Sequence, residues 1–146
     1  MDYDIALDEI SGIISKSKNV LEDVVGYLYN NFGKYSWIGI YIVEGDNLIL
    51  GSWSGEQATE HTRIPIGKGI CGSAAKTGKT EIIPDVNSDP RYLSCFISTK
   101  SEIVVPIKKD DKILGEIDID SDVNDAFNSD DRQFLEKIAD MLSLHI

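Results

Sequence analysis

The chain has 146 residues, of which 42% are hydrophobic, enough for one domain with a substantial core. Its 14 lysine and arginine residues against 25 aspartate and glutamate residues give a net charge of −11, which would repel nucleic acid and anionic lipid. We therefore expect a single domain over residues 1–146 whose partners include neither nucleic acid nor a membrane.

The two cysteines and the first residues of the chain exclude further classes of protein. Cys71 and Cys95 are too few for a disulfide framework, and they lack the close spacing of zinc ligands, so we expect no metal site. They are either a working thiol pair or two inert core thiols. No stretch approaches the roughly 18 apolar residues of a membrane span, and the chain begins with acidic residues where a signal peptide would be basic. We expect a cytoplasmic protein.

Residues 5–32 predict an amphipathic helix. Apolar residues recur there at helical spacing, and the pattern is interrupted near Ser17. Such a helix covers a sheet or pairs with its copy in a homodimer, and the sequence does not decide between these.

Two strands follow, over 36–43 and 48–53, joined by a turn at 45–47. Trp37 and Tyr41 fall on one face of the first of these strands. An aromatic pair there is either plain core or the wall of a ligand pocket.

A glycine-rich segment follows the next short strand and opens a short helix that Gly78 ends. Its glycines match the dinucleotide-binding fingerprint, but the next strand arrives too soon for the usual unit of about 30 residues, and the acidic partner about 20 residues on is missing. Gly78-Lys79-Thr80 imitates the end of a phosphate-binding P-loop, yet Ser73 stands where its first glycine belongs. Neither motif is complete.

The stretch from Cys95 to Asp120 is the predicted reactive centre. A loop over 84–94 precedes it, so Cys95 lies on or beside a connection and its thiol can be reached. Two strands follow, and their β-branched runs flank a short polar connection at 109–112.

Asp118 and Asp120 share one face of the second of these strands, because side chains alternate along it, whereas Ile117 and Ile119 share the other. Like charges on one face are unfavourable unless a cation, a shared proton or a ligand amine lies between them. The alternative is that the two aspartates form the solvated side of an edge strand.

A last helix is predicted to begin at Ser129 as its N-cap and to cover the sheet. The order of elements predicts an α+β fold: an antiparallel sheet of about six strands with helices on one face and a ligand pocket on the other.

Several motifs stand in order along residues 36–127. They are Trp37-x-Gly39-x-Tyr41, Leu50-Gly51, Arg63-Ile64-Pro65-x-Gly67-x-Gly69-x-Cys71-Gly72, Asp85-Val86, Ser101-Glu102-Ile103-Val104-x-Pro106 and Gly115-x-x-Asp118-Ile119-Asp120-Ser121. Their order and spacing resemble the free methionine-(R)-sulfoxide reductases, which are stand-alone GAF domains.

The resemblance implies that the chain reduces free methionine-(R)-sulfoxide to methionine. It implies that Cys95 attacks the sulfoxide sulfur, and that Trp37 and Tyr41 shape the pocket. Glu102, Asp118 and Asp120 would form the carboxyl cluster that holds and protonates the substrate. We expect Glu102 and Asp120 to serve the oxygen and Asp118 the amine. No cofactor is expected.

Recycling departs from the pattern of many family members, which carry a further cysteine just before the Arg-Ile-Pro segment. Here Thr59, Glu60, His61 and Thr62 stand at those positions. The resemblance then implies that Cys71 resolves the Cys95 sulfenic acid as a disulfide, which thioredoxin or another dithiol reduces. His61 is either a solvated loop residue or a base in the vacated place.

Two hypotheses from other classes stay open. The chain could be a ligand-sensing GAF module without catalysis, because many such domains are sensors. It could also be a thiol redox switch that uses only Cys71 and Cys95.

Overall fold

The computed structural model describes residues 2–93, 96 and 98–146. Its elements are α1 (Tyr3–Lys16), α2 (Val20–Asn31), β1 (Trp37–Glu44), β2 (Asn47–Gly55), β3 (Arg63–Pro65), α3 (Gly69–Thr77), β4 (Glu81–Ile83), a 3-10 turn at Val86–Ser88, β5 (Ser101–Lys109), β6 (Lys112–Ser121), α4 (Ser129–Leu142) and a 3-10 turn at Ser143–His145.

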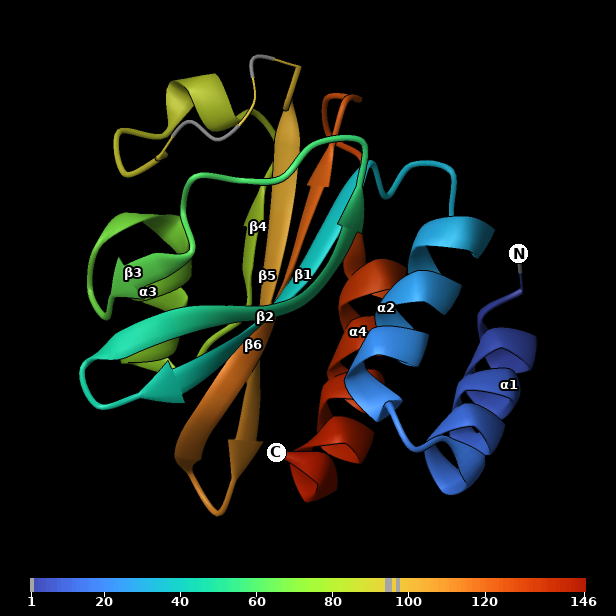
Figure 1. Cartoon of the computed structure of the whole chain (residues 1–146). Coiled ribbons are helices and arrows are strands. Elements are labelled where there is room, and N and C mark those ends of the chain that lie inside the picture. Colours follow the sequence, from blue (N-terminus) through green and yellow to red (C-terminus); the bar gives the residue numbers. More distant parts are fainter. Residues whose placement is uncertain (1, 94–95, 97) are drawn as a thin grey trace.

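The six strands form one antiparallel sheet in the order β3-β2-β1-β6-β5-β4. Helices α1, α2 and α4 lie together on one side of the sheet, and α3 lies on the opposite side near β3 (Figure 1). The predicted α+β architecture with an antiparallel sheet of about six strands is therefore confirmed.

The predicted break near Ser17 separates α1 from α2. The Ser17 hydroxyl accepts a hydrogen bond from the backbone N–H of Asn19 at 2.9 Å, which offers the backbone a local alternative to helix continuation. Ala6 and Ile10 of α1 are buried, and α1 packs against α2 and α4. The apolar face of α1 is thus used to cover the core within the chain.

Strand alternation divides the buried residues between the two faces of the sheet. Ile117 and Ile119 of β6 face the three helices, together with Ile38 and Ile40 of β1. The main core also contains residues from the helices, among them Val24, Leu28, Phe134, Leu135 and Ile138. The second, smaller cluster lies on the other face, beneath α3, and includes Trp37, Tyr41 and Cys71.

Helix α4 begins one residue earlier than predicted, so Ser129 is not its N-cap. The Asn128 side chain accepts hydrogen bonds from the backbone N–H groups of Asp130 and Asp131, and the Asp131 carboxylate accepts one from the N–H of Asn128. This reciprocal capping box needs an acid three residues after the cap, which the Asn128 and Asp131 pair supplies.

Asp131 also ties α1 and α4 to the connection between α2 and β1. Its buried carboxylate accepts hydrogen bonds from Lys34 Nζ at 2.6 Å, Tyr3 Oη at 2.8 Å and Tyr35 Oη at 2.9 Å. Burial alone would raise the pKa of Asp131, but these hydrogen bonds outweigh it and hold the pKa below its ordinary value.

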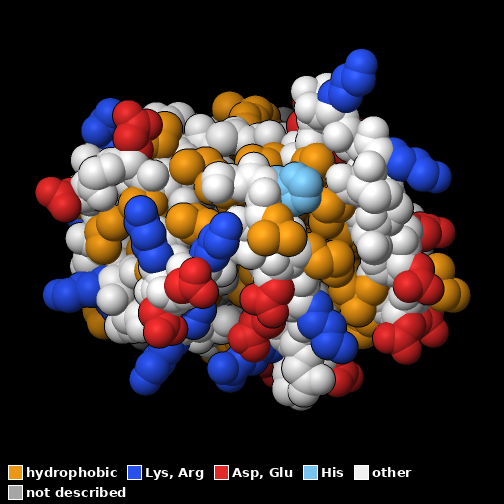
Figure 2. All heavy atoms as spheres, turned by 90° about the horizontal axis from the view of Figure 1, so that it is seen from below, with side chains coloured by type: hydrophobic (Ala, Val, Ile, Leu, Met, Phe, Trp, Pro, Cys, Tyr) orange, Lys and Arg blue, Asp and Glu red, His pale blue; other side chains and the backbone are white. Residues whose placement is uncertain are grey.

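One face of the molecule carries both signs of charge. Figure 2 shows acidic and basic side chains interspersed with small groups of hydrophobic ones on the face seen from below. Within the part of the chain that the structure describes, no helix has the length and apolar character needed to cross a bilayer.

The Asp131 network yields a first prediction. Asp131→Ala should lower the free energy of unfolding by about 3 kcal/mol at pH 7, because it leaves a lysine and two hydroxyls without their shared acceptor. The folded-state pKa of Asp131 lies below its unfolded value of about 3.9, so its contribution is present above that pH and is lost as the pH falls through the folded value. Urea unfolding at several pH values should show the difference between wild type and variant shrinking below about pH 4.

The matched control is Asp130→Ala, which removes an exposed acid from the same helical turn. It should cost less than about 1 kcal/mol. Equal losses in the two variants would contradict the role of the Asp131 network.

Candidate active site

Strand β6 is an interior strand of the sheet, and its acidic side chains are buried. It pairs with β1 on one side and with β5 on the other, and Asp120 and Asp118 lie opposite Trp37 and Gly39 of β1. Asp118 is 4% exposed and Asp120 is 3% exposed. The alternative that these aspartates are the solvated side of an edge strand is therefore wrong.

Cys71 approaches this acidic face from α3. Its Sγ lies 4.0 Å from Glu102 Oε2 of β5. The sulfur of Cys71 and one carboxylate oxygen from each of Glu102 and Asp118 lie within 4.8 Å of one another, and all three residues are buried. The structure thus brings together three predicted site residues that come from three different elements.

The glycines at the start of α3 allow the helix to pack closely against its neighbours. A Cβ at Gly72 would lie 2.6 Å from the carbonyl oxygen of Pro65, and Gly69 has a φ of +70° and a Cβ position 2.8 Å from Leu93. Only glycine combines that backbone conformation with such close approach. The spacing that imitates a dinucleotide fingerprint is explained here by the docking of α3.

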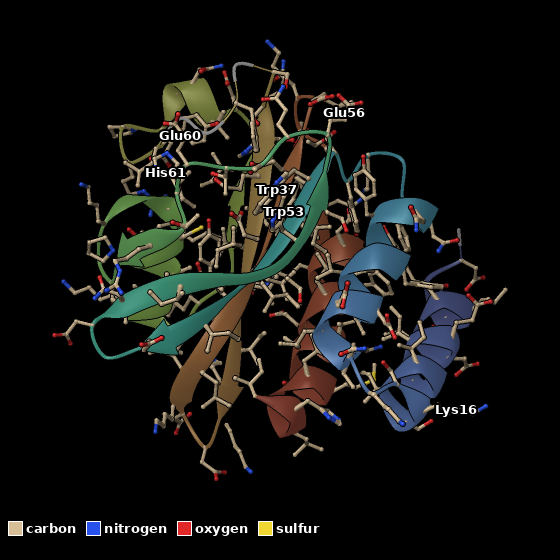
Figure 3. The ribbon with its side chains drawn as sticks, viewed as in Figure 1. Lys16, Trp37, Trp53, Glu56, Glu60 and His61 are labelled. Atoms are coloured by element: carbon tan, nitrogen blue, oxygen red, sulfur yellow. The ribbon has the colours of Figure 1, made fainter. Side chains whose placement is uncertain are left out.

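A small cavity of about 20 Å³ adjoins the Cys71 thiol. This is room for about one water molecule. The Tyr41 hydroxyl at its edge donates a hydrogen bond to the carbonyl oxygen of His61 at 2.7 Å, and Figure 3 shows His61 on the connection between β2 and β3. The cavity is lined by Tyr41, His61, Ile64, Ile70, Cys71, Tyr92, Leu93, Glu102 and Asp118.

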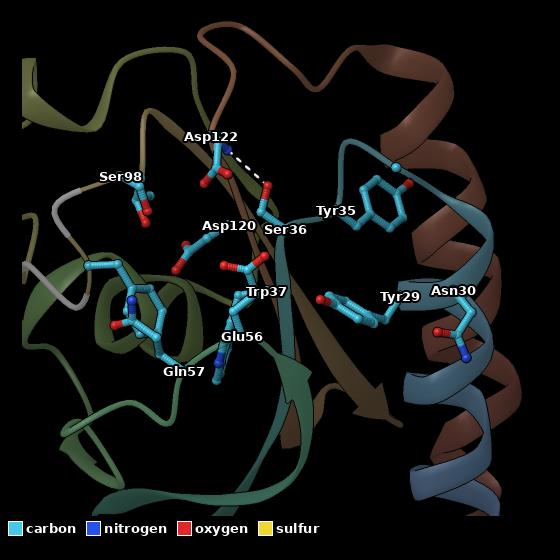
Figure 4. A pocket seen from close by; sticks show the side chains of 13 residues that line it. Tyr29, Asn30, Tyr35, Ser36, Trp37, Glu56, Gln57, Ser98, Asp120 and Asp122 are labelled. Carbon is cyan, nitrogen blue, oxygen red and sulfur yellow. Dashed lines mark hydrogen bonds between the residues drawn. The ribbon is translucent and has the colours of Figure 1, made fainter.

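A larger pocket of about 360 Å³ opens at the end of β1 and β6 (Figure 4). Trp37 and Asp120 line it together with residues of α2, whereas Tyr41 borders the small cavity, so the two predicted aromatics border different hollows. Trp37 stacks on Trp53 with ring centroids 6.3 Å apart (Figure 3). The remaining lining residues are Tyr29, Asn30, Gly33, Tyr35, Ser36, Glu56, Gln57, Phe96, Ser98, Thr99 and Asp122.

Several buried polar atoms of the described residues on this face make no hydrogen bond. Among the described residues, Trp37 Nε1, Asp118 Oδ1 and Asp120 Oδ1 are buried without a hydrogen bond. A buried polar atom in this condition is costly unless something binds it. These atoms offer one donor and two acceptors to a polar ligand.

Burial controls the charge of these groups. Burial first, and the neighbouring Asp118 second, raise the pKa of Asp120 well above its ordinary value. Burial also raises the pKa of Asp118, although hydrogen bonds from Glu102 and Cys71 oppose the shift. For the Cys71 thiol, burial and then the carboxyls of Asp118, Glu116 and Glu102 raise the pKa well above its usual value. The site therefore favours the protonated forms of these groups more than water does.

Glu116 belongs to this face and was missed in the sequence. It lies two residues before Asp118 on β6 and is fully buried. The same alternation that pairs Asp118 with Asp120 extends back to Glu116, and this signal could have identified it.

Cys95 lies outside the described residues, but its chain neighbours are placed. Leu93 lines the small cavity beside Cys71, and the Phe96 ring lies 6.0 Å from the Trp37 ring at the larger pocket. Arg91 anchors the preceding segment by hydrogen bonds to Glu81 of β4 at 3.0 and 3.2 Å. Among the described residues, Leu93 and Phe96 thus lie at the hollows that Cys71 and Trp37 border, and Arg91 is fixed to β4.

A metal ion would have to use Cys71, Glu102 and Asp118, the one group within the described ranges whose donor atoms are close enough. Three protein ligands are one fewer than a structural zinc site has.

Comparison with known proteins identifies the fold and its relatives. The GAF domain model matches residues 18–146. The free methionine-R-sulfoxide reductase of Saccharomyces cerevisiae is 46% identical over 112 residues, which cover 74% of this chain and 61% of the yeast protein.

Two solved structures agree closely with this one. The type II free methionine-R-sulfoxide reductase of Thermoplasma acidophilum is 38% identical, with a TM-score of 0.84 over 90% of this chain and 93% of that one. The free methionine-R-sulfoxide reductase of Neisseria meningitidis in complex with its substrate is 32% identical, with a TM-score of 0.91 over 97% of this chain and 86% of that one.

The surroundings of Cys71 yield a second prediction. In a Cys95→Ser background, native Cys71 should react with iodoacetamide much more slowly at pH 7 than the same thiol in urea, because burial and nearby carboxyls suppress the thiolate. At pH 9, Asp118→Asn should raise the labelling rate several-fold, since removal of a neighbouring negative charge lowers the thiol pKa.

The control is Asp122→Asn, which changes an exposed acid at the larger pocket. It should leave the labelling rate unchanged. A native thiol that reacts as fast at pH 7 as the unfolded one would refute the described environment.

Proposed function

The chain belongs to the free methionine-R-sulfoxide reductase family of GAF domains, and we propose that it reduces free methionine-(R)-sulfoxide to methionine by thiol chemistry. Members of this family are oxidoreductases. The observation that carries the proposal is the row of buried carboxyls beside a cysteine on one face of the sheet. A sulfoxide oxygen is a poor leaving group until it is protonated, and sulfur is attacked best by a soft nucleophile, so a carboxylic acid and a thiol meet both needs.

In the first step, Cys95 attacks the sulfoxide sulfur and takes up its oxygen as a sulfenic acid, and methionine leaves. Asp120, together with Glu102, supplies the proton to the oxygen. The raised pKa of Asp120 supports this role, because only an acid that is still protonated near neutral pH can donate.

Asp118 binds the substrate ammonium in this proposal. Its Oδ1 is buried without a hydrogen bond, which suits an acceptor for an incoming N–H donor. A bound ammonium would also favour the ionised form of Asp118. Its positive charge would favour a neighbouring thiolate as well, and so offset the acids, which disfavour the thiolate.

In the second step, Cys71 attacks the Cys95 sulfenic acid. The new S–S bond replaces the S–O bond, and water leaves. Support comes from Leu93, which borders the same cavity as Cys71. Leu93 lies two residues before Cys95 in the sequence. Thioredoxin or a similar dithiol in the cytoplasm then reduces the disulfide.

The substrate should be the free amino acid. The larger pocket of about 360 Å³, which Asp120 lines, has room for one small molecule, and Asp118 and Glu102 lie at the neighbouring small cavity beside Cys71. A methionine sulfoxide inside a polypeptide lacks the ammonium, so it would leave the acids without a partner.

A third prediction tests the activity itself. Free methionine-(R)-sulfoxide, its S epimer and a peptide containing the sulfoxide are each incubated with the protein and dithiothreitol, and methionine is measured by chromatography. Only the free R epimer should be turned over, because only it presents both the ammonium and the correct oxygen to the acids. Binding without turnover would favour a ligand-sensing module instead.

A fourth prediction separates the two cysteines. With the thioredoxin system, Cys95→Ser should be inactive, whereas Cys71→Ser should release about one methionine per chain and then stop, because its sulfenic acid has no resolving thiol. Dithiothreitol is the control, since a small dithiol can reduce the sulfenic acid directly and should restore turnover to Cys71→Ser. Full activity of Cys71→Ser with thioredoxin would refute the resolving role.

A further inference from the structure

Trp37 lies between an acid and a glycine on one face of the sheet. Asp120 of β6 is opposite Trp37 on one side, and Gly55 of β2 is opposite it on the other. Residues opposite each other on neighbouring strands point to the same face of a sheet. The direction in which the large indole leans therefore decides whether the space in front of Asp120 is open or filled.

The indole leans toward β2, where two glycines make room for it. A Cβ at Gly55 would lie 2.3 Å from Trp37 Cδ1 and 3.1 Å from Trp37 Cγ. A Cβ at Gly39, two residues further along β1, would lie 2.4 Å from Cη2 and 2.8 Å from Cζ3 of the same side chain. Contacts this close force atoms to shift. Gly39 and Gly55 thus form a glycine seat for the indole, which a larger residue at either position would disturb.

Two further rings contact the indole on the glycine seat. Trp53 of β2 lies opposite Gly39, and its ring stacks on the Trp37 ring with centroids 6.3 Å apart and planes 14° from parallel (Figure 3). The Phe96 ring lies 6.0 Å from the Trp37 ring and is tilted by 48°. Each tryptophan thus faces a glycine on the neighbouring strand, which allows the diagonal pair of tryptophans to stack.

Stability alone does not explain this arrangement. A glycine inside a strand weakens the strand, because it has no side chain to pack and loses more conformational freedom on folding than other residues do. Trp37 Nε1 is also buried without a hydrogen bond within the part of the chain that the structure describes, which is a further cost. Local features that lower stability without a structural gain are expected at functional sites.

The glycine seat leaves an open approach to Asp120. Trp37 and Asp120 both line the larger pocket of about 360 Å³ (Figure 4). Because the indole lies over Gly55 of β2, it forms a wall of this pocket and does not fill the space on the β6 side. Asp120 is the acid to which the proposed function assigns proton transfer, so access to it matters for the reaction.

We propose that Gly39 and Gly55 are positioning residues that hold the Trp37 indole away from Asp120 and so keep the larger pocket open to the substrate. The inference rests on the proposed function, in which Asp120 must reach the sulfoxide oxygen. A methyl group at either glycine forces the indole off β2. The empty space beside the indole is the larger pocket, so a displaced indole narrows the approach to Asp120.

The test compares the steady-state kinetics of Gly39→Ala and Gly55→Ala with those of the wild type, with free methionine-(R)-sulfoxide as substrate and dithiothreitol as reductant. Each variant should lower kcat/KM about 100-fold, since a displacement of about 1 Å at an active site can cause such a loss. The loss should appear mainly in KM, because the substrate must displace the indole before it binds. Gly12→Ala is the control, because a Cβ there meets no atom within 4 Å, and it should match the wild type.

A double-mutant cycle gives a readout that a general loss of stability would not produce. Trp37→Phe removes Cζ3 and Cη2, which a Cβ at Gly39 would strike, but retains atoms at the Cγ and Cδ1 positions, which a Cβ at Gly55 would strike. The other atom close to Gly39, Leu50 Cδ1 at 3.0 Å, is the end of a flexible side chain. In the Trp37→Phe background, Gly39→Ala should change kcat/KM less than about threefold, whereas Gly55→Ala should keep most of its effect.

The same cycle is measured on the free energy of unfolding in urea, so it can be read even if Trp37→Phe is inactive. Gly39→Ala should destabilise the wild type more than it destabilises Trp37→Phe, because the clash with the outer indole ring is then gone. Equal effects of Gly39→Ala in both backgrounds would contradict the glycine seat.

Circular dichroism reports the position of the indole directly. The chain has two tryptophans, Trp37 and Trp53, and two stacked indoles couple their ultraviolet transitions into a paired positive and negative band. Trp53→Phe should abolish this pair of bands, which assigns it, and Gly39→Ala and Gly55→Ala should weaken it. An unchanged pair of bands in both glycine variants, or a weakened pair with the kcat/KM of the wild type, would overturn the inference.

Failure of the proposed function has a different signature. Absence of turnover by the wild type would contradict that function, whereas an active wild type whose glycine variants are equally active would contradict only the inference. In the first case the paired bands and the unfolding cycle still decide whether Gly39 and Gly55 seat the indole.

Discussion

The placement of β6 in the interior of the sheet is the constraint on which the rest of the molecule depends. Because a strand presents alternate residues to opposite faces, Ile117 and Ile119 enter the helical core while Glu116, Asp118 and Asp120 enter the other side. The layer of α1, α2 and α4 covers one face of the sheet and α3 covers the other, and these layers keep water from both faces of β6. The same short segment thus builds the stable half of the protein and its acidic half.

The two faces differ in what they contribute. The helical face is apolar, and the Asp131 network ties α1 and α4 to the chain that enters β1, with each donor paired. The acidic face contains buried atoms that lack partners, which is energetically unfavourable for the free protein. The helical face therefore stabilises the fold, and the acidic face lowers its stability. This division is common where activity demands a strained or unsatisfied site.

The acidic face also links protonation to ligand binding. Within the described residues, burial raises the pKa values of Glu116, Asp118, Asp120 and the Cys71 thiol, and repulsion by neighbouring carboxyls adds to the shift for all of them except Asp118. A ligand that brings a positive charge changes this balance for the whole group, because the groups interact with one another. In the proposed function the ammonium of a free amino acid would supply such a charge, and its binding would be coupled to the chemistry.

The sequence by itself determined the element types, the antiparallel α+β class and the shared face of Asp118 and Asp120, because these follow from local periodicity and strand alternation. Local patterns could not distinguish an edge strand from an interior one, nor choose Asn128 over Ser129 as the cap of α4. Only the tertiary structure brought Cys71 of α3 next to Glu102 of β5 and Asp118 of β6 and left Glu116 without a partner. Those relations arise from the docking of α3 across the sheet, a contact between distant segments that no local spacing encodes.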